Sequence, residues 1–159
     1  MSKRIYADFS YLILLAATFG AVMVLGIFVA PVVFNSDKIT VGLCIDHYNA
    51  GMVMAEIFRR FGHWLNMLVI FVLIYEAAWY KAGQRDALSF ASAFIVVFTS
   101  LLFSEVYTPK ILDMQALGAE ATKSDTFANI HLASELDFKI LAVALLVLFV
   151  RRLMLLRRT

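Results

Sequence analysis

The chain has 159 residues, of which 62% are hydrophobic and only 16% are charged. A typical soluble domain has ~45–50% apolar and ~25% charged residues, so the composition excludes an ordinary soluble domain and indicates an integral membrane protein. The formal net charge is only +2, and the sequence holds no nucleic-acid motif, no glycine-rich phosphate loop and no Ser/His/Asp signature. We therefore expect the lipid bilayer as a partner, no nucleic acid and no enzymatic activity.

Apolar segments predict four membrane-spanning helices in one domain covering residues 1–159. Their approximate bounds are residues 8–34, 51–80, 87–108 and 127–155. Pro31 is expected to kink or end the outer part of the first helix, and Pro109 to bend or interrupt the chain after the third. The short turn Lys81–Asp86 makes the second and third helices antiparallel neighbours. The sequence thus predicts an all-α, up-down-up-down four-helix bundle in the membrane.

The distribution of positive charge predicts the orientation of these helices. Eight Lys and Arg residues fall on the side of the two termini and six on the other side. Cytoplasmic segments of membrane proteins carry the excess of Lys and Arg. Both termini are therefore expected in the cytoplasm, with the two longer connections outside, in a bacterial inner membrane.

The fourth helix carries charge into its predicted span. Its apolar run Ile140–Val150 has eleven residues, whereas a helix needs roughly 20 residues to cross a bilayer core. His131, Glu135 and Lys139 must then enter the membrane region, and their i, i+4, i+8 spacing places them in one arc of the helix. Ionisable residues inside a membrane usually face protein or water and often mark function.

A second polar stripe lies in the outer half of the second helix. Glu56, Arg60 and His63 share one side of it, Arg59 flanks them, and Glu105 ends the third helix. Together the two stripes predict an outer-facing pocket. Its expected lining residues are Arg59, Arg60, His63, Glu105, His131, Glu135 and Lys139. Arg60–Glu135 and Lys139–Glu105 are examples of ion pairs that would neutralise charge between helices. The alternative is a purely structural clamp of salt bridges.

The middle of the four helices is predicted to be apolar. No acidic residue is evident near the midplane, which argues against a proton pathway or a simple channel through one monomer. Glu76 lies beside Trp79 and Tyr80, which are typical of an interfacial aromatic belt, so it is expected at the level of the lipid headgroups. The pocket is therefore expected to be closed from below.

Soft ligands gather on the outer side, which raises the question of a cofactor. His63 and His131 stand on different helices at comparable depth, and such a pair can hold a transition metal or a haem. The outer-loop segment Cys44-x-Asp46-His47 is a weaker metal motif. The identity of any cofactor is left open by the sequence, because neither His-x-x-x-His nor Cys-x-x-Cys occurs.

Motifs spread over most of the chain carry a family resemblance. They are the Ala30–Pro31 end of the first helix, the segment Ala50–Phe61, the segment Tyr107–Gly118, and His131-x-x-Ser134-Glu135-x-x-x-Lys139. The chain resembles a bacterial group of small four-span membrane proteins of unknown function related to eukaryotic transmembrane protein 205. The resemblance implies the four-helix architecture and no established catalytic activity. Its eukaryotic relatives are associated with metal-drug tolerance and vesicle membranes, which favours metal binding or transport.

The sequence leaves two functions open. The first is a small inner-membrane protein whose outer polar pocket binds a small ligand, ion, metal or haem. The second is a non-catalytic accessory or assembly subunit of a larger membrane complex. The small-xxx-small pair Ala16/Gly20 allows close helix approach, and therefore favours a homo-oligomer or such a complex.

Overall fold

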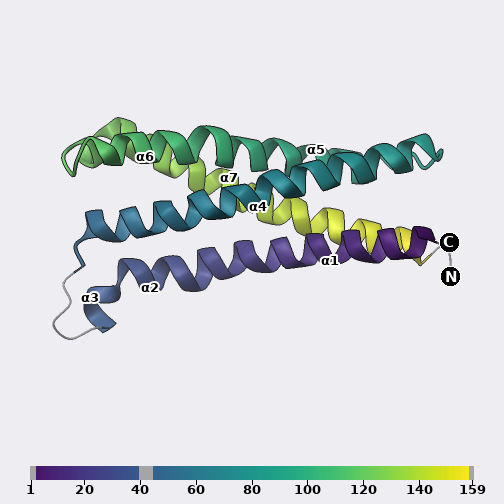
Figure 1. Cartoon of the computed structure of the whole chain (residues 1–159), viewed down its shortest axis with the longest axis horizontal. Coiled ribbons are helices and arrows are strands. Elements are labelled where there is room, and N and C mark those ends of the chain that lie inside the picture. The colour runs from purple at the N-terminus through teal and green to yellow at the C-terminus, as the bar shows by residue number, and fades with distance from the viewer. Residues whose placement is uncertain (1–2, 40–44, 158–159) are drawn as a thin grey trace.

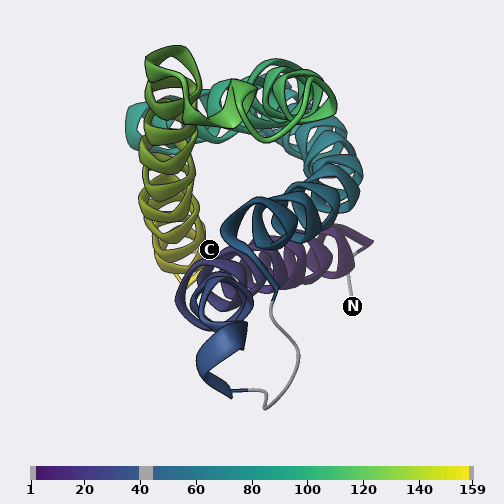
Figure 2. The ribbon, with the colours of Figure 1, turned by 90° about the vertical axis from the view of Figure 1, so that its left-hand side faces the viewer.

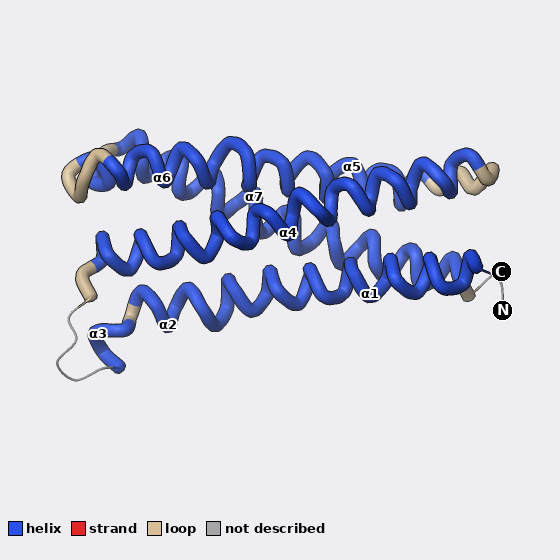
Figure 3. The backbone as a smooth tube through the Cα atoms, in the orientation of Figure 1, coloured by secondary structure: helices blue, strands red, loops and turns tan. Residues whose placement is uncertain are grey.

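A computed structural model describes residues 3–39 and 45–157, and every regular element in these ranges is a helix (Figures 1 and 3). The elements in chain order are α1 (Lys3–Val24), η1 (Leu25–Val29), α2 (Ala30–Phe34), α3 (Ser36–Ile39), α4 (His47–Lys81), α5 (Ala87–Leu101), η2 (Leu102–Tyr107), α6 (Thr108–Ala116), η3 (Ala121–Lys123) and α7 (Asp125–Leu156). The all-helical fold class is thereby confirmed for the described residues.

Long helical rods pack side by side as a ring when viewed from one end (Figure 2). α7 packs against α1 on one side and α5 on the other, and α5 packs against α4. α4 and α5 are antiparallel neighbours, as their short connection predicts. α1 begins and α7 ends at one end of the molecule, here named the terminal end (Figure 1). The opposite end, which holds α2, α3, α6 and η3, is named the loop end.

Three of the rods are long and apolar enough to cross a membrane, namely Ile5–Phe34, His47–Lys81 and Ala87–Ala116. α7 has 32 residues but is not among these three, because charged residues bound its apolar run on both sides, with Lys139 before it and Arg151 and Arg152 after it. Fully buried side chains from all the rods meet in the centre. They include Leu15, Leu65, Leu68, Val72, Val96, Leu141, Leu145 and Leu148. Close packing of these side chains holds the helices together, since lipid tails are as apolar as leucine.

The sequence allowed either a distortion or an end of the helix at each proline, and the structure shows that neither helix ends there. A π-helical segment, η1 or η2, ends two residues before Pro31 and Pro109 respectively, and the helix continues to Phe34 or Ala116. A proline removes a backbone donor and its ring clashes with the carbonyl four residues earlier. The wider i→i+5 turn relieves that conflict, so the chain stays helical.

Capping residues explain where α4, α5 and α7 begin. Asp46, Asp86 and Ser124 each accept a hydrogen bond from a backbone N–H three residues later. Such caps satisfy donors that the first turn leaves unpaired. α4 therefore begins at His47, four residues before the expected start, and α7 at Asp125, two residues before the expected start. The apolar pattern alone does not report these first turns.

Candidate functional site

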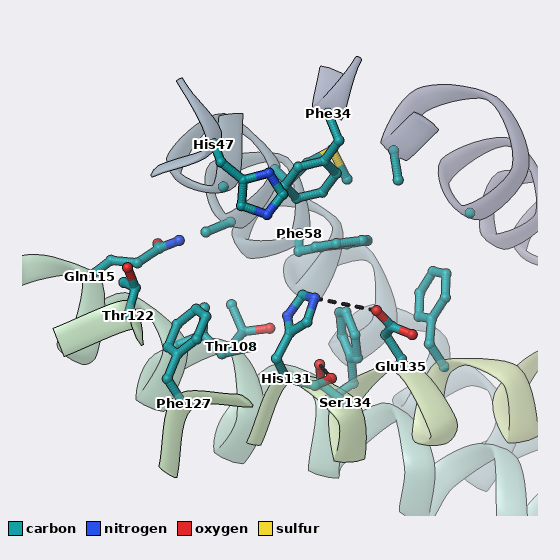
Figure 4. A pocket seen from close by; sticks show the side chains of 18 of the residues that line it. Phe34, His47, Phe58, Thr108, Gln115, Thr122, Phe127, His131, Ser134 and Glu135 are labelled. Atoms are coloured by element: carbon teal, nitrogen blue, oxygen red, sulfur yellow. Dashed lines mark hydrogen bonds and ion pairs between the residues drawn. The ribbon is translucent and has the colours of Figure 1, made fainter. Parts of the chain in front are cut away.

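A cavity of about 730 Å³ lies between the helices at the loop end. η1 and α2 form one wall, α4 a second, η2 and α6 a third, and α7 a fourth, so that segments far apart in sequence enclose a single space. Figure 4 shows side chains from these walls converging on it. Because every rod contributes, the cavity is a product of the tertiary structure.

Aromatic rings form the floor of the cavity. The ring centroids of Phe58 and Phe103 are 5.3 Å apart, those of Phe58 and Phe138 are 5.5 Å apart, and those of Phe103 and Phe138 are 4.9 Å apart. Edge-on and tilted ring contacts of this kind are favourable beyond the area that they bury. The three phenylalanines come from α4, η2 and α7, and therefore close the cavity toward the bundle core.

One edge of the cavity is charged, and it consists of His131, Glu135 and Lys139 on α7, here named the α7 rim. His131 Nε2 lies 3.3 Å from Glu135 Oε1, and Lys139 Nζ lies 3.6 Å from Glu135 Oε2. These side chains are 43%, 49% and 70% exposed. Residues that line the cavity and are also exposed show that the cavity is open to its surroundings along this edge (Figure 4).

The cavity also has polar residues that the sequence did not single out as pocket lining. His47 makes a tilted ring contact with Phe34, with ring centroids 5.1 Å apart, and faces the cavity across from His131 (Figure 4). The Tyr48 hydroxyl donates a hydrogen bond to the Gln115 carbonyl over 2.7 Å, and the Gln115 side chain is buried beside Gly51. These groups fix α4 against α6. Their spacing in sequence carries no signal, because they meet only through the fold.

The other residues predicted for the pocket lie elsewhere. Arg59 Nε and Arg60 Nε bond Glu56 on the same helix at 2.7 and 2.8 Å, on an exposed ridge of α4. His63 is exposed and does not line the cavity. Glu105 is exposed and accepts a hydrogen bond from Asn66 Nδ2. The structure therefore brings together the α7 part of the predicted set and separates it from Arg59, Arg60, His63 and Glu105.

The interhelical ion pairs named from the sequence are replaced by pairs within helices. Arg60 pairs with Glu56 instead of Glu135, and Lys139 pairs with Glu135 instead of Glu105. The physical reason is that residues four apart on a helix are already neighbours.

Histidine placement bears on the metal and haem hypothesis. His131 shares the cavity with His47 and not with His63. Within residues 3–39 and 45–157, no group of three or more His, Cys, Asp or Glu side chains is arranged to hold a metal ion. Cys44, part of the weaker metal motif, lies outside the described residues.

A second polar centre lies at the terminal end and is buried. Arg152 Nε donates to Glu76 Oε1 over 3.0 Å, and a second guanidinium nitrogen pairs with the other carboxylate oxygen. The Tyr11 hydroxyl donates to the same Oε1 over 3.0 Å. Glu76 is 6% exposed and Arg152 is 2% exposed. Glu76 is thus an interior residue that joins α4 to α7 and α1, and its expected level at the lipid headgroups stays a prediction.

Aromatic rings and a second carboxylate complete this centre, here named the Glu76–Arg152 network. The rings of Tyr11 and Tyr75 stack with centroids 3.7 Å apart, and the Tyr75 hydroxyl donates to buried Asp8 over 2.7 Å. The Arg152 guanidinium lies over the rings of Tyr75 and Trp79, at 5.4 and 5.2 Å from their centroids. The aromatics around Glu76 are therefore ligands of a buried cation. The sequence signal for this network is Glu76, an acidic residue inside an apolar run with Tyr75 before it and Trp79 after it.

Next to this network, Asp86 joins two helices at the surface. Its carboxylate caps α5 through Ser89 N–H and accepts Arg151 Nε of α7 over 3.0 Å. The Arg151 guanidinium, with help from the Ser89 donors, holds the pKa of Asp86 well below its usual range. This pair fixes the register of α5 against α7.

Residues 13–120 match the family described as "Domain of unknown function (DUF4149)". The chain belongs to this family. No curated protein and no solved structure gives a significant match. The matched segment of this DUF4149 protein includes three walls of the cavity, whereas the α7 rim lies beyond it. The relation to transmembrane protein 205 stays a prediction.

Proposed function

We propose that this DUF4149 protein is a four-span bacterial inner-membrane protein that binds a small amphipathic molecule in the cavity at its loop end. The three long apolar helices support the membrane assignment. The excess of Lys and Arg at the terminal end supports cytoplasmic termini. The loop end is then on the outer side.

α7 is the fourth span in this proposal, despite its charged first half. A charged side chain is tolerated in a membrane when it faces a protein interior or a water-filled space. His131, Glu135 and Lys139 face the cavity and pair with one another. Beyond Lys139 the helix is apolar as far as Val150, and its length of 32 residues exceeds the roughly 20 needed to span.

The observation that carries the ligand proposal is the cavity itself. Small-molecule pockets typically have volumes of about 300–1,000 Å³, with apolar walls and a few placed polar groups. This cavity has a comparable volume, an aromatic floor and a charged rim on one edge. An apolar body would lie on Phe58, Phe103 and Phe138, and a polar end group would meet His131, Glu135 and Lys139. The apolar walls favour such a molecule over a bare ion.

Photo-crosslinking in lipid nanodiscs tests this proposal. A photoactivatable single-chain amphiphile with an anionic headgroup is expected to label cavity residues such as Met23 and Phe127, identified by peptide mass spectrometry. Ala30 lines the cavity, so Ala30→Trp fills part of it and should reduce that labelling at least tenfold. The matched control is Ala17→Trp, on an exposed position of α1, which should label normally.

Two results would contradict ligand binding in the cavity. One is equal cavity labelling in Ala30→Trp and Ala17→Trp. The other is labelling confined to exposed apolar positions such as Phe94 and Val143, which is the pattern of bulk lipid.

A second candidate is an accessory or assembly subunit, and one observation favours it. Around Gly20 no atom would lie within 4 Å of an added Cβ, and neighbouring Ala16 and Ala17 are exposed. Small residues at helix interfaces let backbones approach in lipid, so this face of α1 suits a second chain. Native mass spectrometry in mild detergent tests it. A monomeric mass without a stoichiometric partner would remove this candidate and leave the ligand proposal untouched.

A further inference from the structure

α5 and α7 meet through two matched stripes of buried residues. In α5 and η2 the stripe is Asp86, Ser89, Ala93, Val96, Ser100 and Phe103. In α7 it is Arg151, Leu148, Ala144, Leu141, Asp137 and Ser134. The Asp86–Arg151 pair fixes the register, and equal steps along two antiparallel helices keep each successive pair at the same level. Ser100 therefore lies at the level of Asp137.

This Ser100–Asp137 layer holds two buried polar groups with no partner. Asp137 is 5% exposed and Ser100 is fully buried. Neither Asp137 Oδ2 nor Ser100 Oγ has a hydrogen-bond partner within the described residues. The layer below is apolar, with Val96 and Leu141, and the layer above holds Phe103 and Ser134, whose hydroxyl donates to the His131 carbonyl. An isolated ionised carboxylate in such surroundings is strongly unfavourable.

The layer also lies deep in the apolar region. Ser100 is the 14th of the 30 residues of the apolar helix Ala87–Ala116. Asp137 is therefore near the middle of a span, where the sequence predicted only apolar residues. Asp137 lies between Glu135 and Lys139 in the sequence but outside their arc of the helix, so the spacing of these residues does not indicate it.

We propose that Asp137 is a proton-binding site that exchanges its proton only through the cavity. A proton neutralises the carboxyl group without any further ligand. A metal cation such as Na⁺ would require several oxygen ligands, whereas the adjacent layers supply mainly hydrocarbon and the Ser134 hydroxyl, which already donates to the His131 carbonyl. This inference goes beyond the proposed ligand binding and stands without it.

No charged group on the surrounding elements replaces the proton. The described side chains of α1, α5, η2, α6 and η3 and the rest of α7 form no ion pair with Asp137. The Asp, Glu, His, Lys and Arg side chains described on these elements and at the N-cap of α5 are Asp8, Asp86, Glu105, Lys110, Asp113, Lys123, Asp125, His131, Glu135, Lys139, Arg151 and Arg152. Of these, Glu135 and Lys139 are nearest in sequence, but they pair with each other at the exposed rim.

The path to water is open on one side only. Ser134 and Phe103, one layer above, both line the cavity, and Ser134 is roughly 4.5 Å from Asp137 along the helix axis. In the other direction the seam is filled by Leu141, Ala144 and Leu148, and the Asp86–Arg151 pair is roughly 21 Å away. Water that hydrates an ionised Asp137 must therefore come from the cavity, past Phe103 and Phe138.

Infrared difference spectroscopy of the full chain in nanodiscs tests the proton site. The wild type is expected to show the C=O stretching band of a protonated carboxylic acid at neutral pH, and to lose it in alkaline buffer. The band should be absent in Asp137→Asn and present in the control Asp113→Asn, which changes an exposed carboxylate of α6. Ser100→Ala should leave the band in place, because Ser100 Oγ and Asp137 Oδ2 are not hydrogen-bonded to each other.

The rate of hydrogen–deuterium exchange of that band tests the access path. Phe103→Leu, which opens the cavity floor, should accelerate exchange at least tenfold, whereas Leu148→Val on the opposite side should leave it unchanged. A wild type without the band at neutral pH, or a band unchanged by Asp137→Asn, would overturn the proton site. Loss of the band on adding NaCl at constant pH would show a cation site instead. Equal acceleration by Leu148→Val would overturn the one-sided path.

Discussion

The two ends of the molecule use charged residues in opposite ways. At the loop end, Glu56 bonds Arg59 and Arg60 on the same helix, and Glu135 lies between His131 and Lys139 on the same helix. All of these side chains are at least 42% exposed. At the terminal end, Glu76 and Arg152 belong to different helices and are almost fully buried.

This difference shows at which end of the molecule charged residues fix the packing of the helices. Exposed ion pairs are worth little because water and salt screen them. A buried pair has lost its water, so that removing one partner leaves an uncompensated charge. The Glu76–Arg152 network therefore holds α1, α4 and α7 in one arrangement at the terminal end. The exposed ion pairs of the loop end do not fix the packing of the helices in this way.

The largest expected effect is that of removing Arg152. Arg152→Ala leaves Glu76 buried without its cation, and should lower the free energy of unfolding by about 3–5 kcal/mol. The measurement is an unfolding titration in mixed detergent micelles, followed by circular dichroism. The control is Arg157→Ala, at the exposed position that follows the same helix, which should unfold as the wild type does.

Replacing both Glu76 and Arg152 separates two contributions to stability. One is the cost of leaving Glu76 buried without its cation, and the other is the stabilisation that the intact pair provides. In Glu76→Leu/Arg152→Met the network is replaced by apolar side chains, which is often close to neutral. Recovery of most of the lost stability is expected. A double variant as unstable as Arg152→Ala, or an Arg152→Ala variant as stable as Arg157→Ala, would contradict the role assigned to the buried pair.

A smaller effect is expected at Asp86, which caps α5 and binds Arg151. Asp86→Ala should cost about 1 kcal/mol through loss of the cap alone. Because folding lowers the pKa of Asp86 from its ordinary 3.8, this stabilisation is complete above that value and is lost as the pH falls below it. The wild type should therefore lose stability in acid more steeply than Asp86→Asn. Parallel acid profiles of these two proteins, measured by thermal unfolding, would show that the contact contributes nothing.

The smallest effect is expected on the exposed ridge of α4. Glu56→Gln removes the carboxylate shared by Arg59 and Arg60, and should leave the unfolding midpoint unchanged, because both guanidinium groups remain in contact with water. The same titration checks this. A loss as large as that of Asp86→Ala would mean that the loop end also depends on its charges, and the contrast between the ends would disappear.

Much of the helical architecture is visible in the sequence, but the contacts between helices are not. The apolar runs locate the rods, and the i, i+4, i+8 spacing of His131, Glu135 and Lys139 places them on one arc. Whether Lys139 meets Glu135 or Glu105 depends on competition between a neighbour on its own helix and a group on another. Sequence signals for helix ends do not reveal the η1 and η2 segments, because a wider turn accommodates each proline without ending the helix.

The sequence by itself determined the membrane class, the helical rods and which charged residues share one face of a helix. These follow from hydropathy and from a fixed helical period, and neither requires knowledge of a neighbour. Only the tertiary structure decided that Glu76 and Arg152 meet, that Asp137 is buried, and that His47 and not His63 shares the cavity with His131. Those outcomes depend on which faces of the helices pack together and in which register. That choice is made by the summed packing of many side chains and not by any local spacing.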